Sequence, residues 1–391
     1  MIQQKQVLVL INPTRRFRHV RRLQRLLRQH DRILEVRVTE SKADLMRQVS
    51  EFTQSEFAHL LVWGGDGTAH DAINSLYRGK IAMVGEHVGE DVGGPLGEQE
   101  LESVVAGESF RKAVGFFRGG TGNGIQDSYE VPVRMARQVD TYIEAVKHGY
   151  TIDVDLIEIE YNNTTRYAQL IGMGYDAETL AKREQYKEKT AKGRTVTRPG
   201  MIQYLVSAIG YGLGDGFKRR TTFNLDLFSG KYAFRGPRVN AEFPFARLSL
   251  ERSPVMLEIG TRPYYGKMFK VCPDVVCNDG HIDVYVYDFA GRLDGLRNLA
   301  DVWFGRHSRI NQRYARAAKP VIERYEVGAL HVSSEKPFRF HADGELLGAD
   351  VPSADGRYRV SLRVLPRALT FLVPAPFYRL FHPRLEETVV K

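Results

Sequence analysis

The sequence predicts an α/β domain followed by an antiparallel β-sandwich domain. Residues 1 to about 140 alternate short apolar runs with helical patterns, which is typical of βαβ units and a mainly parallel sheet. After about residue 145 the chain changes to short β runs, and residues 153–160 alternate between polar and apolar side chains. Such runs, separated by turn signals, favour an antiparallel sandwich. The length of 391 residues allows two or three domains, and a hydrophobic fraction of 43% is ample for their cores.

Each expected element follows from local spacing. The apolar runs predict strands at 7–11, 33–38, 59–63 and 113–117, with helices at 18–29, 42–53 and 69–78 between them. Ser41 and Asp44 fit an N-cap and a first-turn acid for the helix that starts at residue 42. In the second domain, β runs recur at 165–171, 222–228, 255–260, 282–288, 338–341 and 357–364, and a helical pattern spans 200–212.

Composition narrows the class of protein. No window approaches the roughly 20 apolar residues that span a bilayer. Cys272 and Cys277 flank Pro273 and suit neither a metal site nor a disulfide framework, which points to a reducing compartment. The N-terminal residues run directly into an expected strand, with no signal peptide. We therefore expect a cytoplasmic protein, peripheral on the inner face of the membrane if it binds lipid.

The net charge of +9 is concentrated near the N-terminus. Nine arginines lie between residues 15 and 37, and only Asp31 and Glu35 oppose them. Val20 and the neighbouring leucines form a stripe of period near 3.6, so we expect an amphipathic helix with an arginine-covered outer face. That face fits a solvated surface, a contact with anionic lipid headgroups, or nucleic acid. No nucleic-acid-binding motif accompanies the charge, so we expect no nucleic-acid partner.

An acidic segment interrupts the α/β pattern. Residues 86–110 contain seven acids, several glycines and no lysine or arginine. Low hydrophobicity and charge of one sign predict a mobile loop inserted into the first domain. The loop is either a passive insertion or a flap near a bound nucleotide.

Two glycine-rich turns follow predicted strands of the first domain. Residues 64–68 follow an apolar run and precede a helical segment, and residues 119–124 follow the strand at 113–117. Glycine lets the backbone approach a ligand closely and adopt positive φ. The free N–H groups of such a turn and of the following helix can bind an anion. Two units of this kind indicate a nucleotide held between two loops; the alternative is a pair of ordinary tight turns.

These motifs, with others in order along the chain, resemble the diacylglycerol kinase catalytic family, which includes bacterial diacylglycerol kinases and the sphingosine and ceramide kinases. Gly-Gly-Asp-Gly-Thr at 64–68 and Gly-Thr-Gly-Asn at 120–123 match the signature and the second loop of the family. Gly-Gly-Asp-Gly-Thr also occurs in NAD kinases, so the ordered set carries the resemblance. The other matching segments are 7–13, Thr39, 171–177, 264–266, 278–280 and 343–345.

The resemblance implies a fold and an activity. Residues 1–140 would form a parallel sheet like those of NAD kinase and phosphofructokinase, residues 145–370 a β-sandwich that binds the lipid, and 371–391 a tail. The active site would lie in the cleft between the two domains. The implied activity is transfer of the γ-phosphoryl group of ATP to a lipid hydroxyl, on diacylglycerol, a sphingoid base or a related lipid presented at a membrane surface. A homodimer is left open, and the alternatives are a NAD kinase or a catalytically weak lipid-binding member.

The resemblance also implies a nucleotide site at the two glycine turns. A carboxylate beside phosphates is repelled unless a cation lies between them, so Asp66 suggests Mg²⁺ alongside ATP and a catalytic role. The alternative role of Asp66 is to cap the loop. The implied nucleotide-binding residues are Asn12, Thr39, Gly64, Gly65, Asp66, Gly67, Thr68, Ala69, His70, Gly120, Thr121, Gly122 and Asn123.

In the family, the turn at 343–345 carries the acid that takes the proton of the lipid hydroxyl. A carboxylate within hydrogen-bond reach of an alcohol can do this. Glu345 and Asp343 are both candidates, and we favour Glu345 because its side chain reaches further from the turn. An ordinary Asp-Gly turn is the alternative.

Residues 277–281 resemble the family segment that binds a structural Mg²⁺. Asp279 would be the side-chain ligand, and Val276 and His281 would offer carbonyl oxygens, a donor set that suits Mg²⁺. An Asn-Asp-Gly hairpin turn is the alternative interpretation of this segment.

The second loop departs from the family pattern. Arg118 and Gly119 replace the usual Pro-Leu, and Gly124 replaces an Asp or Asn. Arg118 could direct charge toward the phosphates and Asp127 could substitute for the missing side chain, so the departures concern the level of activity more than the fold. The aromatic and basic segment 374–383 either covers the first domain or touches a membrane.

Overall fold

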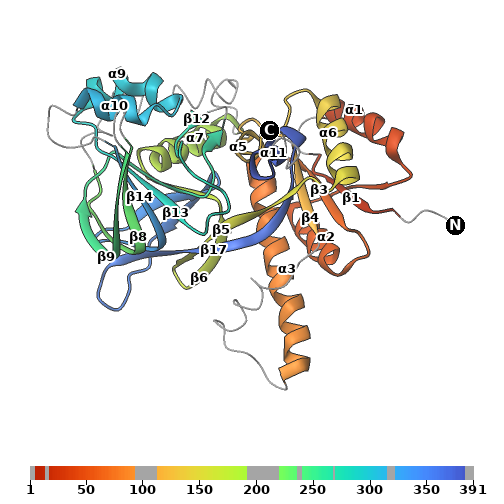
Figure 1. Cartoon of the computed structure of the whole chain (residues 1–391), viewed down its shortest axis with the longest axis horizontal. Helices are drawn as coiled ribbons and strands as arrows, with labels where there is room; N and C mark the ends of the chain where they lie inside the picture. Colours follow the sequence, from red (N-terminus) through yellow and green to blue (C-terminus); the bar gives the residue numbers. More distant parts are fainter. Residues whose placement is uncertain are drawn as a thin grey trace, which may run out of the picture. The chain divides into compact units, whose positions relative to one another are not determined.

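The computed structural model describes residues 5–13, 17–92, 112–191, 220–235, 240–266, 269–314 and 322–383 (Figure 1). The chain divides into two compact units, Met1–Val154 with Pro366–Lys391, and Asp155–Leu365. The long strands β5 (Thr151–Tyr161) and β17 (Tyr358–Leu372) each contain a boundary between these units.

The first unit is built on a parallel sheet with the order β17-β4-β3-β1-β2. Every residue of β1 is at most 1% exposed, as expected for a strand covered on both faces. The edge strand β2 instead alternates between buried and more exposed residues. The bounds are β1 (Val7–Ile11), β2 (Leu34–Val38), β3 (His59–Gly64) and β4 (Ala113–Arg118).

Helices cover both faces of this sheet. The direction of the chain along the sheet reverses at β2, so right-handed crossovers place α1 on one face and α2 and α3 on the other. Leu23 of α1 and Ile143 of α6 share one core cluster with Val9 of β1. Ser41 caps α2 by accepting the Asp44 N–H at 3.0 Å, as predicted. The helices are α1 (Phe17–Leu27), the 3₁₀ turn η1 (Arg28–His30), α2 (Lys42–Gln54), α3 (Asp66–Val92), α5 (Gly124–Ser128), α6 (Met135–His148) and α11 (Ala375–Phe381).

Helix α3 continues well beyond the expected 69–78. It begins at Asp66 and ends at Val92, so residues 86–92 are helical where a mobile loop was expected. No proline interrupts this stretch, and a glycine within a helix costs only about 1 kcal/mol relative to alanine, so the other helix-forming residues prevail. The rest of the predicted acidic insertion, residues 93–110, lies outside the described residues, as does the helical pattern at 200–212.

The second unit is built from antiparallel strands in the order β16-β15-β7-β10-β13-β14-β17, with β8 paired to β14 and β9, and β5 paired to β17 and β6. Ile157, Leu225, Val284 and Leu362 from four of these strands share one core cluster. An α/β unit followed by an antiparallel β-sandwich is the predicted fold class, and it is confirmed. The bounds are β6 (Thr164–Ala168), β7 (Leu170–Gly174), β8 (Phe223–Arg235), β9 (Asn240–Arg252), β10 (Met256–Gly260), β11 (Tyr264–Gly266), β12 (Phe269–Lys270), β13 (Ile282–Tyr287), β14 (Ile322–Ser334), β15 (Phe338–Ala342) and β16 (Glu345–Ala349).

Short helices and turns complete the second unit. Its helices are α7 (Tyr175–Ala191), α9 (Arg292–Trp303) and α10 (His307–Tyr314). Asn162 and Asn163 form the β5–β6 turn with φ of 46° and 57°, a conformation that favours asparagine in hairpins. Among the described residues, no helix of either unit combines the length and the apolar character needed to cross a membrane.

The end of the chain belongs to the first unit. Thr370 and Phe371 of β17 pair in parallel with β4. The ring of Phe377 in α11 lies 5.6 Å from that of Tyr129. Of the two roles considered for residues 374–383, the cover of the first domain is therefore the one observed.

Candidate active site

The first glycine turn lies at the carboxyl edge of the parallel sheet, where β3 ends and α3 begins. Asn12, directly after β1, donates its side-chain amide to Thr68 Oγ1 at 3.1 Å and its backbone N–H to the Trp63 carbonyl at 3.0 Å. Thr39, directly after β2, donates its N–H and its hydroxyl to the Ile11 carbonyl at 2.9 and 3.3 Å. Three neighbouring strand ends thus meet where open α/β sheets bind ligands.

The first residues of α3 differ in exposure. Gly67 is exposed, and a Cβ added there would meet nothing within 4 Å. Ala69 and His70 are 2% and 1% exposed and belong to the packed interior of the unit. The first N–H groups of a helix have no intrahelical acceptor, so the open side of the turn at Gly67 is suited to bind an anion.

The second glycine turn packs against the first through backbone atoms. The Gly119 N–H donates to the Gly64 carbonyl at 2.8 Å. A Cβ on Gly119 would lie 2.7 Å from that carbonyl oxygen, and a Cβ on Gly120 would lie 2.5 Å from the Gly65 Cα. A side chain cannot be accommodated at these distances, so the contact between the two turns requires glycine.

Asp66 links the two turns with both carboxylate oxygens. Its Oδ2 accepts the Asn123 N–H at 2.8 Å, and its Oδ1 accepts the Gly124 N–H at 2.7 Å. Asn123 has a φ of 63°, and its Oδ1 accepts the Gly120 N–H at 3.0 Å. A Cβ on Gly122 would overlap Asp66 Oδ2, so this glycine makes room for the carboxylate.

These bonds match the loop-capping role that was the alternative for Asp66. Each carboxylate oxygen has two lone pairs, so the same geometry is compatible with a cation on Asp66 as well. Thr121 lies in the second turn and is exposed. The hydrogen bonds of Asp66 and Asn123 fix the backbone on either side of it. The two turns therefore form one assembly with Asp66 at its centre.

The unusual residues of the second loop bind each other. Arg118 Nη1 lies 2.5 Å from Asp127 Oδ1, and Arg118 Nε donates to the Val131 carbonyl at 2.7 Å. Both side chains of the ion pair are largely buried. Arg118 therefore neutralises the charge of Asp127. From the sequence, the two residues were expected to act separately, Arg118 toward the phosphates and Asp127 in place of a missing side chain.

In the second unit, Asp343 and Gly344 form the two-residue turn of the β15–β16 hairpin, with φ of 50° and 87°. Asp343 is 2% exposed, and Arg262 Nη2 donates to its Oδ1 at 3.0 Å. The N–H groups of Gln169 and Leu170 donate to the same carboxylate at 3.1 to 3.3 Å. A buried ion pair and two backbone groups thus occupy the Asp343 carboxylate.

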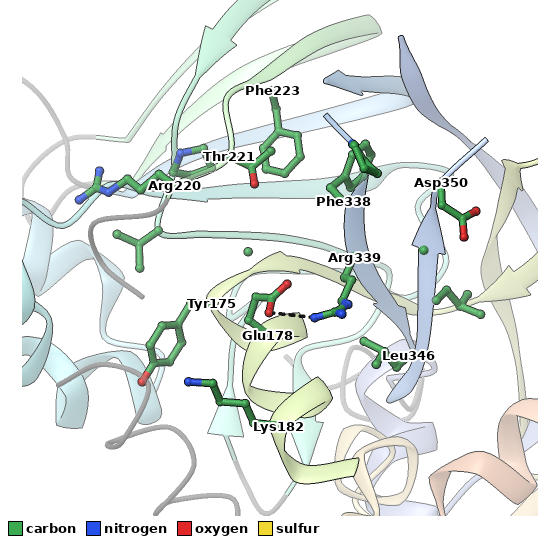
Figure 2. Close-up of a pocket in the computed structure, with 16 residues that line it drawn as sticks. Tyr175, Glu178, Lys182, Arg220, Thr221, Phe223, Phe338, Arg339, Leu346 and Asp350 are labelled. Carbon is green, nitrogen blue, oxygen red and sulfur yellow. Dashed lines mark hydrogen bonds and ion pairs between the residues drawn. The ribbon is translucent and has the colours of Figure 1, made fainter. Parts of the chain in front are cut away.

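Glu345 follows this turn as the first residue of β16, and it is half-buried. A cavity of about 940 Å³ lies next to it along the chain, because Leu346 and Leu347 of β16 line that cavity. Figure 2 shows Leu346 on one side of the cavity and Tyr175 of α7 on another. Glu345 itself is not among the described residues that line the cavity, so its link to the cavity is its place next to Leu346 in β16.

This cavity combines apolar walls with charged side chains. Phe223 and Phe338 are among its apolar residues, and Arg339 Nη1 pairs with Glu178 Oε2 at 3.2 Å (Figure 2). A mixed lining suits an amphipathic molecule, whose apolar part and polar part need different walls. The other charged side chains of the lining are Lys182, Arg220 and Asp350.

The predicted Mg²⁺ segment forms a tight turn held by a buried acid. Asp155 is fully buried; its Oδ2 accepts the Gly280 N–H at 2.7 Å, and its N–H donates to the Cys277 carbonyl at 2.7 Å. Asp279 Oδ1 accepts the His281 N–H at 3.0 Å. Burial raises the pKa of the Asp279 carboxyl above its usual value. These contacts match the hairpin-turn alternative.

The same segment also fits a hard cation by its chemistry. Asp279, whose side chain retains 31% exposure, shares one short turn with the carbonyls of Val276 and His281. Carboxylate and carbonyl oxygens are the ligands that Mg²⁺ takes in proteins.

The sequence interpretation did not assign a role to Asp155 or Arg262. Arg262 is 1% exposed and fixes the turn at Asp343, as Asp155 fixes the turn at Gly280. Asp155 could have been noticed as an acid within a half-buried strand pattern. The role of Arg262 could not be predicted from neighbouring residues, because its partner, Asp343, lies 81 residues further along the chain.

Two glycine turns joined at the carboxyl edge of a parallel sheet place this chain among α/β proteins with a glycine-rich site at that edge. The model of the diacylglycerol kinase catalytic domain matches residues 6–159, and that of the YegS C-terminal NAD kinase beta sandwich-like domain matches residues 245–373. Residues 6–159 therefore form a diacylglycerol kinase catalytic domain, and the resemblance drawn from the motifs is confirmed.

Solved structures from Bacillus anthracis str. Sterne share this fold. One, named as a candidate diacylglycerol kinase, is 15% identical with a TM-score of 0.58, and the match covers 96% of this chain and 100% of that chain. A second, named as a diacylglycerol kinase, is 16% identical with a TM-score of 0.54, covering 95% and 98%. At this identity the likeness shows the fold alone. None of the curated proteins compared matches this chain.

Proposed function

We propose that this protein is an ATP-dependent lipid kinase that transfers the γ-phosphoryl group to a hydroxyl of diacylglycerol, a sphingoid base or a related lipid. The observation that supports this most is the pair of glycine turns that Asp66 joins at the carboxyl edge of the sheet. The second support is a cavity with apolar and charged walls, lined by Leu346 and Leu347, which follow half-buried Glu345 in β16. That the active site lies between the two units stays a prediction.

In this proposal the glycine turns hold the nucleotide. Phosphoryl transfer mainly requires reactants in line and neutralised charge on the phosphates. The open N–H groups near Gly67 and the exposed Thr121 would face the phosphates, with Asn12 and Thr39 at the same edge. Asp66 would keep the two turns in register, and when bound, Mg²⁺ would neutralise phosphate charge.

Glu345 is the proposed base for the lipid hydroxyl. The Asp343 carboxylate accepts bonds from Arg262 and two backbone N–H groups, which leaves it poorly suited to accept a further proton. Glu345 is more exposed than Asp343, and the next residue of β16, Leu346, lines the cavity. Asp279, with the carbonyls of Val276 and His281, would hold the structural Mg²⁺.

The test is direct. The purified protein is incubated with ATP labelled on the γ-phosphate, with mixed micelles of a total lipid extract and, separately, with NAD⁺ as acceptor. We expect label in lipid, and mass spectrometry of the labelled product identifies the lipid. Label in NADP⁺, or ATP hydrolysis without a labelled lipid, would contradict the proposal. Heat-denatured protein and the Glu345→Gln variant are the controls.

We further propose that α1 holds the enzyme on an anionic membrane surface such as the inner face of the cytoplasmic membrane. Arg18, Arg22 and Arg25 of α1 are exposed, while Val20 and Leu23 are buried. Each arginine near an anionic surface contributes about 1 kcal/mol, and salt screens such charges over about 8–10 Å.

Vesicles that contain phosphatidylserine test this docking surface. Replacing Arg18, Arg22 and Arg25 with Gln should weaken vesicle binding by up to roughly 100-fold at low salt, which corresponds to three such increments. The matched control replaces three other exposed basic residues with Gln, namely Arg134 at the N-cap of α6 and Arg137 and Lys147 within α6, and it should change binding little. Equal losses in both variants would indicate a non-specific charge effect.

A further inference from the structure

A row of three residues crosses adjacent strands of the second unit. Gly172 of β7 lies directly opposite Glu258 of β10 on one side and His341 of β15 on the other. Residues directly opposite in antiparallel strands point to the same face of the sheet, so both side chains stand over the glycine. Asp176, in the first turn of α7 four residues after Gly172, enters the same space.

The three side chains converge. His341 Nε2 lies 2.5 Å from Asp176 Oδ2, and the ligand atoms of Asp176, Glu258 and His341 all lie within 4.8 Å of one another. A Cβ on Gly172 would overlap both Asp176 Oδ2 and His341 Nε2, so this glycine provides the space in which they meet. Glu258 and His341 are 0% exposed, and Asp176 is 2% exposed.

This cluster is not satisfied by the protein groups described around it. Among the described residues, no N–H or O–H group donates to either carboxylate oxygen of Glu258, and Asp176 Oδ1 and His341 Nδ1 also lack a partner. Glu258 and Asp176 can bond to each other only by sharing a proton. Buried polar groups in proteins are nearly always paired, because leaving one unpaired costs roughly 1–3 kcal/mol and more for a charged group. Several such atoms in one place therefore indicate a missing partner.

Charge gives the same indication. As ionised groups, Asp176, Glu258 and the adjacent Asp343 carry three negative charges, and Arg262 carries one positive charge. The group is therefore short of two positive charges. One divalent cation would supply them, or two protons would, since burial raises the pKa of the Glu258 carboxyl well above its usual value.

We propose that Asp176, Glu258 and His341 form a buried binding site for a divalent transition-metal ion, with Zn²⁺ the best fit. One imidazole nitrogen and two carboxylate oxygens are ligands that Zn²⁺ takes at short range, and Mn²⁺ is the nearest competitor. The cluster is distinct from the segment around Asp279 discussed for Mg²⁺.

The ion would act on structure. Across Gly172 of β7, it would join β10, β15 and the start of α7 at one point, and its ligand His341 lies two residues before the turn at Asp343. A metal that binds the folded state alone stabilises it by mass action. The proposal does not depend on the lipid kinase activity, because occupancy and stability can be measured without any substrate.

The first experiment measures metal content. The full-length wild-type protein, expressed in medium with added Zn²⁺ and Mn²⁺ and purified without a chelator, should hold about one ion per chain by elemental analysis. Glu258→Gln should lose most of the ion. Glu158→Gln, which alters another largely buried acid of the unit that pairs with Arg363, is the matched control and should retain it.

The second experiment separates the metal from shared protons. Dialysis of the wild type against a chelator should lower the melting temperature, and added Zn²⁺ should restore it. If protons neutralise the cluster, the wild type contains no stoichiometric metal, its melting temperature ignores chelator and Zn²⁺, and Glu258→Gln is as stable as the wild type or more so. That result overturns the proposal, and the wild-type measurements decide even if a variant fails to fold.

Discussion

Asp66 in the first unit and Asp343 in the second both lie in glycine turns, and the carboxylate of each accepts hydrogen bonds from backbone N–H groups. Asp66 accepts from Asn123 and Gly124, and Asp343 accepts from Gln169 and Leu170. The surroundings differ. Asp66 is partly exposed, whereas Asp343 is 2% exposed and also pairs with a buried guanidinium.

The difference separates a structural acid from one that can still meet a ligand. The Asp343 carboxylate is enclosed, which is why we propose its half-buried neighbour, Glu345, as the base. Asp66 is partly exposed just after the end of β3, so a structural role and a role toward a ligand are compatible in one residue. Substitutions at these turns should therefore differ in whether they change activity, stability or both.

The largest effect is expected at Glu345. Glu345→Gln keeps the size of the side chain and removes the proposed base, so turnover should fall by roughly 10²–10⁴-fold, the usual contribution of general acid–base catalysis. Nucleotide affinity and the melting temperature should hardly change, because the residue is half-buried and the proposed base contacts the lipid. Initial rates with a saturating lipid substrate, together with nucleotide titration, provide the measurement.

Asp343→Asn should show the opposite pattern. It leaves the Arg262 guanidinium buried without its carboxylate, and breaking a buried ion pair costs about 3–5 kcal/mol of unfolding free energy. Urea unfolding measures this loss, with Glu345→Gln as the neighbouring control. A variant of Asp343 that is fully stable but inactive would transfer the catalytic role from Glu345 to Asp343.

Local patterns predicted what local forces determine. The expected strands at 7–11 and 113–117 match β1 and β4 within a residue, because continuous apolar runs between turn signals leave few alternatives. The predicted end of the helix at residue 78 was wrong, because α3 continues to Val92. The prediction gave the acidic composition more weight than the absence of proline. Strand β9 was not predicted; Pro244 lies within its run, and most of its residues are exposed, as in an edge strand.

The sites needed contacts that no local pattern contains. The motifs located residues 64–68, 120–123 and 343–345. They could not show whether an acid in a motif caps a loop or takes part in the reaction. Asp66 and Asn123 are 57 residues apart, and Asp343 and Arg262 are 81 apart. Only the fold shows which carboxylate oxygens are already occupied.

Asp66→Asn should affect both stability and activity. The amide keeps one acceptor oxygen, so one of the two charge-assisted bonds to the second turn is lost, at a cost of about 1.5–3 kcal/mol. Turnover should also fall sharply, because the two turns would no longer hold the nucleotide in register. Thermal unfolding and ATP titration measure these effects. Near wild-type turnover in a destabilised variant would leave Asp66 with the structural role alone.

The smallest effect is expected at Arg118 and Asp127, the ion pair of the second glycine loop. It resembles the pair of Asp343 and Arg262 in kind, but Arg118 retains 12% exposure, so water screens part of the interaction. A double-mutant cycle with Arg118→Gln, Asp127→Asn and the combined variant should give a coupling of about 1 kcal/mol, well below the loss expected for Asp343→Asn. If the pair serves only to fix the loop, the double variant should regain part of the nucleotide affinity that each single variant loses. Additive losses of nucleotide affinity would instead indicate that Arg118 and Asp127 act separately on the nucleotide, as first considered from the sequence.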